Sequence, residues 1–210
     1  LGFIAARGDG VYGFSSSVLS GTVYRTLTAE KRRLIHKTAA AVLSGSRGTH
    51  DKVDAISLSR HWIEAGSGVQ AVPWLMNALE QCLDLGDLRR AETLSRELHA
   101  RTESEEKSAH GEVLAFFDAR LQLIMGKFQL AYDSLKGIIE NLRGSRLAQG
   151  PFLMAQSMEN LGFPPKEALA FYEKAATEAE KAGDMNTLAQ ALGSAGSLHL
   201  ATGSRQSALK

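Results

Sequence analysis

The chain has 210 residues, 44% of them hydrophobic, and its 24 Lys and Arg residues nearly balance its 23 Asp and Glu residues. Ordinary hydrophobic content with a net charge of +1 excludes a disordered chain, and a single cysteine excludes a disulfide scaffold. No run of 18 apolar residues and no secretion leader occurs, so we expect a cytoplasmic location and no membrane partner. Because the chain starts with Leu1 and stops within a helical pattern, we expect a fragment truncated at its C-terminus.

The composition favours helices. There are 29 Ala and 28 Leu residues against 8 Val and 7 Ile residues, and no Val or Ile follows Ile139. Unbranched side chains and alanine favour helix, whereas strands prefer β-branched residues. The exception is the N-terminus, where residues 3–7 and 11–14 flank a Gly-Asp-Gly turn that predicts a short β-hairpin. We therefore predict an all-α fold with a short N-terminal β-hairpin.

The helices follow in chain order. We expect them over residues 17–27, 29–43, 52–65, 69–85, 87–100, 105–125, 127–142, 151–161, 165–182 and 184–201, with a further one from residue 204. Thr28 is a suitable N-cap for the second helix, and Pro151 and Pro165 stand where helices should begin. The Gly- and Ser-rich residues 44–50 are the best boundary, which predicts domains over residues 1–48 and 49–210.

Charge is distributed unevenly between these parts. Residues 1–50 hold seven basic and two acidic side chains, a net charge of +5, and the remainder has a net charge of −4. Nucleic-acid surfaces usually interleave aromatic side chains with the basic ones, and the helix over residues 29–43 has none. We therefore expect a solvated face or a contact with a neighbouring domain here, and no nucleic-acid partner.

One spacing recurs along the chain: a Gly, four further residues, and an Ala at the start of the next helix. It joins Gly86 to Ala91, Gly126 to Ala131 and Gly203 to Ala208, with a less certain copy from Gly66 to Ala71, and one extra residue separates Gly162 from Ala168. Such a Gly can end a helix in the left-handed conformation, and a small Ala lets the next helix approach closely. The spacing predicts stacked helical hairpins with a continuous core.

These junctions, together with Gly196 seven residues before Gly203 and Tyr172 four residues after Ala168, resemble tetratricopeptide (TPR) repeats. The resemblance covers about residues 50–210 and implies a right-handed superhelix of α-hairpins that binds a partner. A spacing near 40 residues is similar to the longer repeats of bacterial signalling ATPases and MalT-like regulators.

A second resemblance concerns residues 12–24, 31–36 and 58–66. Their order is similar to the segment in which bacterial STAND-type signalling ATPases, often kinase- or cyclase-associated, pass from the nucleotide-binding core into helical repeats. It implies that residues 1–48 end a winged-helix-like module, and that the repeats are a non-catalytic interaction or sensor domain in signal transduction. An upstream ATPase module would then be a partner within the parent chain. The alternatives are an inducer-binding domain of a MalT/LuxR-like transcription activator and a stand-alone TPR scaffold.

No motif predicts catalysis or a cofactor in this chain. The glycines between Gly8 and Gly13 match a phosphate-loop pattern, but the flanking sequence indicates a plain hairpin turn, and no G-x-x-x-x-G-K-[ST] motif occurs. The six His residues have no metal-binding spacing, so we expect no metal, and His36 and His61 should pack or cap. Cys82 lies on an apolar helix face and should be a buried small side chain.

A binding groove is expected along the first helix of each hairpin. Counting back from the junction glycines at Gly126 and Gly203 by the TPR spacing places four side chains there: Phe116, Arg120, Gln190 and Ser197. Arg120 could hold an acidic group of a peptide, protein or small effector. Phe116 has a competing interpretation as a core residue, shared with Phe117, Trp74 and Tyr132.

Overall fold

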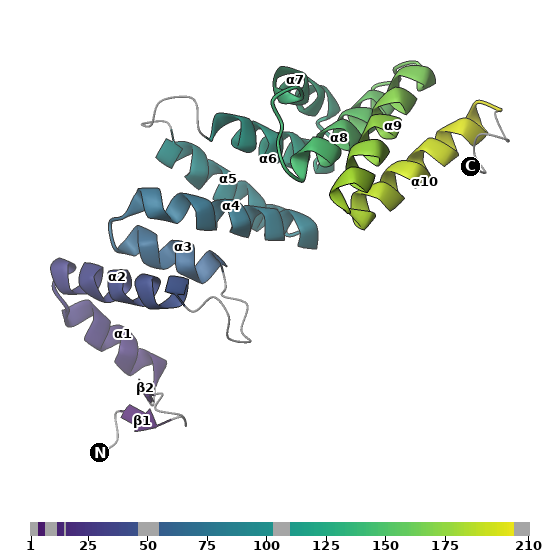
Figure 1. Ribbon diagram of the computed structural model, residues 1–210. Coiled ribbons are helices and arrows are strands. Elements are labelled where there is room, and N and C mark those ends of the chain that lie inside the picture. Colours follow the sequence, from purple (N-terminus) through teal and green to yellow (C-terminus); the bar gives the residue numbers. More distant parts are fainter. Residues whose placement is uncertain (1–3, 7–11, 15, 46–54, 103–109, 204–210) are drawn as a thin grey trace. The chain divides into compact units, whose positions relative to one another are not determined.

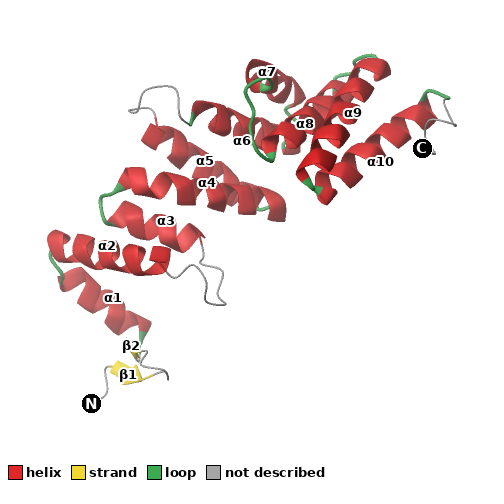
Figure 2. Ribbon diagram, viewed as in Figure 1, coloured by secondary structure: helices red, strands yellow, loops and turns green. Residues whose placement is uncertain are grey.

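A computed structural model of the protein describes residues 4–6, 12–14, 16–45, 55–102 and 110–203. The described residues are almost entirely helical, which confirms the predicted all-α class (Figure 2). The chain forms two compact units, residues 1–78 and residues 79–210. We refer to them as unit 1 and unit 2.

Unit 1 begins with two short strands, β1 (Ile4–Ala6) and β2 (Tyr12–Phe14), which pair antiparallel. The expected turn at residues 8–10 lies outside the described residues, so the hairpin itself stays a prediction. The helices α1 (Ser17–Thr26), α2 (Ala29–Gly45) and α3 (Ala55–Glu64) follow, and α2 packs against α3. The Lys31 N–H donates to Thr28 Oγ1 at 3.3 Å, which confirms the predicted N-cap of α2.

Helix α4 (Gly68–Leu85) runs from unit 1 into unit 2. The remaining helices belong to unit 2: α5 (Leu88–Thr102), α6 (Gly111–Ile124), α7 (Phe128–Ile138), α8 (Arg146–Asn160), α9 (Pro165–Ala182) and α10 (Met185–Ala201). From α5 onward each helix packs against the next (Figure 1). Helices α6 and α7 form one hairpin, and α8 and α9 form the next. In addition, α8 packs against both α6 and α10, so the first helices of the two hairpins and α10 lie beside one another.

Several predicted boundaries differ from the structure or lie outside the described residues. Helix α7 ends at Ile138 rather than at residue 142, and the helix predicted from residue 204 lies outside the described residues. Helix α8 begins at Arg146, so Pro151 lies inside the helix and is fully buried, rather than starting it. A proline within a helix loses its own hydrogen bond to the carbonyl four residues earlier, here that of the partly exposed Leu147. The predicted domain boundary between residues 48 and 49 lies outside the described residues.

The junctions between helices have the conformation that their spacing predicts. Gly86, Gly126 and Gly162 have φ angles of 72°, 75° and 76°. After Gly126, the Lys127 N–H donates to the Gln122 carbonyl at 2.8 Å, and equivalent bonds follow the other two glycines. The junction alanines, Ala91, Ala131 and Ala168, are no more than 1% exposed. Glycine as helix terminator and alanine as close-packing residue are therefore both confirmed.

Gly126→Ala should lower the free energy of unfolding by about 1–2 kcal/mol, because a Cβ is disfavoured at this positive φ. The matched control is Gly193→Ala, in the exposed interior of α10, where an added Cβ meets no atom within 4 Å. That change should stabilise the protein by about 0.5–1 kcal/mol. Urea denaturation followed by circular dichroism measures both, and equal effects of the two substitutions would contradict the assignment of Gly126 as a helix terminator.

Candidate functional site

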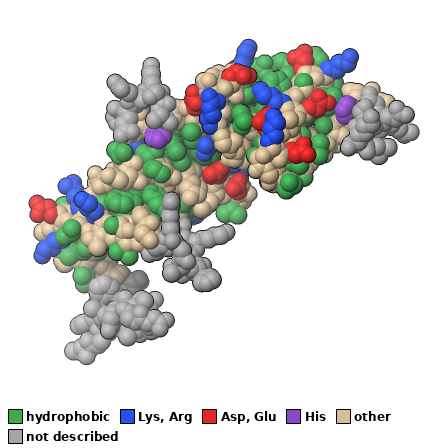
Figure 3. All heavy atoms as spheres, viewed as in Figure 1, with side chains coloured by type: hydrophobic (Ala, Val, Ile, Leu, Met, Phe, Trp, Pro, Cys, Tyr) green, Lys and Arg blue, Asp and Glu red, His purple; other side chains and the backbone are tan. Residues whose placement is uncertain are grey.

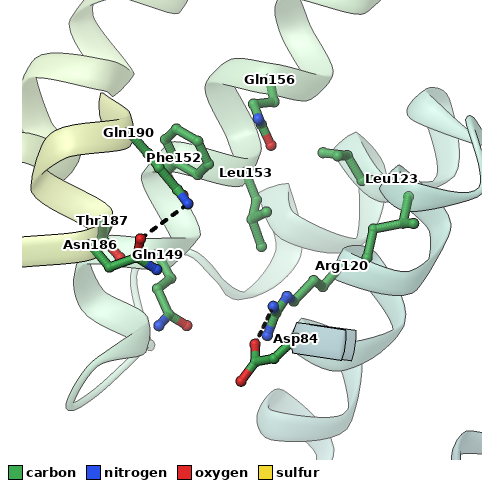
Figure 4. A pocket seen from close by; sticks show the side chains of 11 residues that line it. Asp84, Arg120, Leu123, Gln149, Phe152, Leu153, Gln156, Asn186, Thr187 and Gln190 are labelled. Atoms are coloured by element: carbon green, nitrogen blue, oxygen red, sulfur yellow. Dashed lines mark hydrogen bonds and ion pairs between the residues drawn. The ribbon is translucent and has the colours of Figure 1, made fainter. Parts of the chain in front are cut away.

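The candidate site is a groove in unit 2 formed by the first helix of each hairpin. A hollow of about 270 Å³ is lined by the end of α4 and by α6, α8 and α10 (Figure 4). The side chains that line it are Asp84, Arg120, Leu123, Ile124, Gln149, Phe152, Leu153, Gln156, Asn186, Thr187 and Gln190. No residue from α5, α7 or α9 lines it. This is the arrangement expected where helical hairpins stack with their first helices on one side.

A second hollow of about 560 Å³ continues along α8 and α10. It shares Phe152, Gln156 and Gln190 with the first hollow and adds Glu159, Ala189, Gly193, Ser194 and Ser197. We call the two together the first-helix groove. Three of the four side chains predicted to bind a partner, Arg120, Gln190 and Ser197, line this groove.

Equivalent positions of successive repeats meet in the groove. Arg120, Gln156 and Ser197 each stand six residues before a junction glycine, Gly126, Gly162 or Gly203. Gln149 and Gln190 each stand 13 residues before the last two of these glycines. The groove is therefore lined by side chains from equivalent positions of the repeat, and these positions recur from α6 to α8 to α10.

Phe116 is the exception, and its predicted place in the groove is wrong. The side chain is fully buried and touches Phe117, with ring centroids 5.8 Å apart. The guanidinium of Arg146, from the start of α8, lies 5.8 Å from the centre of the Phe116 ring and covers it. Phe116 is consequently a core side chain, as its competing interpretation held, and it is absent from the groove lining.

Several lining residues were missed by the sequence reasoning, above all Gln149, Phe152 and Gln156 of α8. A helix assumed to start at Pro151 leaves Gln149 outside it. The signal was nevertheless present, because counting ten and six residues back from Gly162, as for Gly126, reaches Phe152 and Gln156. The junction from Gly162 to Ala168 has one residue more than the others, so the count used for Gly126 and Gly203 was not applied to Gly162.

The groove carries few charges and many side-chain amides. At one end the Arg120 guanidinium donates to Asp84 Oδ1 at 2.6 Å; the Arg120 side chain is 20% exposed and that of Asp84 is 59% exposed. Along the groove, Asn186 and Gln190 are hydrogen-bonded to each other, as Figure 4 shows, and Gln149 Oε1 is buried without a partner among the described residues. These groups can donate hydrogen bonds to a neutral polar ligand and accept hydrogen bonds from it.

Glu159 supplies the negative charge at the other end of the groove. The buried Tyr172 hydroxyl donates to Glu159 Oε2 at 2.8 Å. Burial, together with this carboxylate, raises the pKa of the Tyr172 phenol, so Tyr172 remains a donor throughout the physiological pH range. On the face of unit 2 that Figure 3 shows, basic and acidic side chains lie next to one another. The ion pairs of unit 2 include Lys174–Glu140 and Lys181–Glu178.

A Ser, an Asp and a His meet between α5 and α6, but not as a nucleophile and its base. Ser95 Oγ donates to Asp118 Oδ1 at 2.7 Å, and His99 Nε2 lies 2.6 Å from Asp118 Oδ2. The hydroxyl and the imidazole therefore share one carboxylate, whereas nucleophilic catalysis needs the imidazole to face the hydroxyl. Among the described residues, no group of three or more His, Cys, Asp or Glu side chains is arranged to hold a metal ion.

In unit 1, the structure joins three residues from the segments that carry the second resemblance. Tyr24 Oη lies 2.8 Å from His36 Nε2, and His36 Nδ1 lies 2.9 Å from His61 Nδ1. The two histidines pack as predicted, with ring centroids 5.0 Å apart. Burial lowers the pKa of His61, and the positive charges of His36 and Arg60 lower it further.

Comparison with known proteins adds no assignment. None of the described helices is both long and apolar enough to cross a membrane. No protein-family model matches the chain, and no curated protein matches it. The groove and its residues are therefore the basis for assigning a function.

Proposed function

We propose that the protein is a TPR-like repeat module that binds a peptide or protein segment in the first-helix groove, and that it acts by binding rather than catalysis. The observation that carries the proposal is that equivalent positions recur: Arg120 of α6, Gln156 of α8 and Ser197 of α10 line one groove. A surface that repeats along the chain suits an elongated ligand, because each hairpin offers a similar contact to the next stretch of the ligand.

The chemistry of the groove favours a largely neutral segment with one acidic group. Phe152 and Leu153 offer an apolar floor, and Gln149, Gln156 and Gln190 offer amide donors and acceptors. Arg120 is the basic side chain in the lining, and a ligand carboxylate could replace Asp84, whose side chain is mostly exposed, as its partner. A small acidic effector is the second candidate, because the hollow beside Arg120, about 270 Å³, approaches the size of small-molecule sites.

A displayed library of random peptides tests the proposal. Peptides selected on the wild-type protein should lose about tenfold or more in affinity for Gln190→Ala and for Arg120→Ala, since one well-placed anchor contributes at least that much. Lys174→Ala, on the exposed surface of α9, is the matched control and should leave affinity unchanged. Failure to enrich any peptide, or equal binding by all variants, would overturn the assignment of the groove.

We further propose that the repeats belong to a bacterial STAND-type signalling ATPase, and that residues 1–48 end a winged-helix-like module. The resemblance of residues 12–24, 31–36 and 58–66 supports this proposal. Binding in the groove would shift the balance between conformations of the upstream ATPase. The coding sequence around this chain tests the idea: a G-x-x-x-x-G-K-[ST] motif upstream is expected, and its absence over several hundred residues would leave a stand-alone scaffold. A downstream helix-turn-helix would instead favour a MalT/LuxR-like activator.

A further inference from the structure

We infer that the linked side chains of Tyr24, His36 and His61 form a pH-sensitive connection that holds α1, α2 and α3 together only while the histidine pair carries at most one extra proton. This inference concerns unit 1 alone and does not depend on the groove in unit 2. It starts from the contact between two imidazole nitrogens, His36 Nδ1 and His61 Nδ1, which are 2.9 Å apart. At that distance one nitrogen must donate and the other must accept.

The neighbouring hydroxyl completes a directional chain. When the Tyr24 hydroxyl donates to His36 Nε2, His36 Nδ1 carries a hydrogen and donates to His61 Nδ1. One added proton is tolerated, because a charged His36 can donate to both Tyr24 and His61. A second proton places N–H groups on both facing nitrogens, and the hydrogen bond between α2 and α3 is lost.

The surroundings oppose that second proton. The charges acting on His61 are those of His36, from α2, and Arg60, from α3 itself, and both are basic. From α1 the group facing the pair is the Tyr24 hydroxyl, and the Arg32 guanidinium lies 5.5 Å from the centre of the Tyr24 ring. Residues 68–78 of α4 carry no charged side chain.

The sign of the pH dependence follows from these positions. His61 binds its proton less readily in the folded chain than in an opened one, where the imidazole regains its ordinary pKa of about 6.5. The stabilising contribution of the pair is therefore complete above that value, and it is lost as the pH falls below it and through the lower pKa of His61 in the folded chain. At pH 5.5 opening between α2 and α3 should be more frequent than at pH 7.5, by up to about tenfold for one imidazole.

Two measurements on the whole chain test the inference. Imidazole NMR from pH 8.5 to 4.5 should show a His61 pKa below its ordinary value. Hydrogen exchange, corrected for the intrinsic rate, should show a loss of protection of up to about tenfold in α2 and α3 at low pH, and none in α8 and α9. An ordinary pKa for His61, or unchanged protection of α2 and α3 at low pH, would overturn the inference.

Substitutions distinguish an effect of histidine protonation from an effect of side-chain packing. His61→Asn keeps a nitrogen or oxygen near the position of Nδ1 without titrating, so the protection of α2 and α3 should become independent of pH. Tyr24→Phe leaves both imidazoles and should shift the transition without abolishing it, which keeps the test open if His61→Asn does not fold. His199→Asn, on the partly buried face of α10, is the control and should retain the wild-type pH dependence. A pH dependence that survives in His61→Asn contradicts the inference.

Discussion

Phe116→Ala is expected to lower the free energy of unfolding by about 3–5 kcal/mol, the usual loss for a buried aromatic side chain. The Phe116 ring is fully buried against Phe117 and under the Arg146 guanidinium. Its removal leaves a cavity in α6 and takes an aromatic face away from Arg146, whose Nε is already buried without a partner among the described residues. Urea denaturation followed by circular dichroism measures the change.

This substitution also decides between the two interpretations of Phe116. A core residue loses stability on truncation, whereas a groove residue loses ligand affinity and leaves stability nearly unchanged. Leu130→Ala in α7 is the control, because that side chain is 54% exposed and its truncation should change stability by no more than about 0.5 kcal/mol. A stable Phe116→Ala protein that no longer binds the selected peptides would restore Phe116 to the binding groove.

Gly150→Ala is expected to destabilise the protein by about 1–3 kcal/mol, although alanine is normally the better helix former. Gly150 lies within α8, and an added Cβ would overlap Leu142 Cδ1. Leu142 is 2% exposed, so its side chain has little room to move away. The overlap outweighs the gain of about 0.5–1 kcal/mol that Gly→Ala brings inside an ordinary helix, as expected for the control Gly193→Ala.

A double-mutant cycle identifies the cause. Leu142→Ala removes the methyl group that the new Cβ would meet, so Gly150→Ala should cost much less in that background than in the wild type. The coupling free energy should be about 0.5–3 kcal/mol, as for other residues in direct contact. Additive effects of the two substitutions would show that the loss at Gly150 does not arise from Leu142.

The fold class and the helix junctions could be predicted because each depends on local requirements. A left-handed φ at Gly126 and a small side chain at Ala131 are demanded by the turn and by the close approach of the next helix, and both are visible in the spacing alone. The same counting predicted Arg120, Gln190 and Ser197 as binding residues, and all three line the first-helix groove. The start of α8 was predicted five residues too late, because proline favours the first turn of a helix but also occurs inside helices.

What lies against each side chain was decided by the tertiary structure. Phe116 and Arg120 are one helical turn apart on the same face of α6, so periodicity treats them alike. Only the packing of α8 shows that Arg146 covers Phe116 while the longer Arg120 side chain reaches Asp84 at the edge of the groove. In the same way, His36 and His61 are 25 residues apart in the chain, and only the packing of α2 on α3 brings their ring nitrogens into contact. The sequence determined the helices and where they turn; contacts between distant residues required the folded chain.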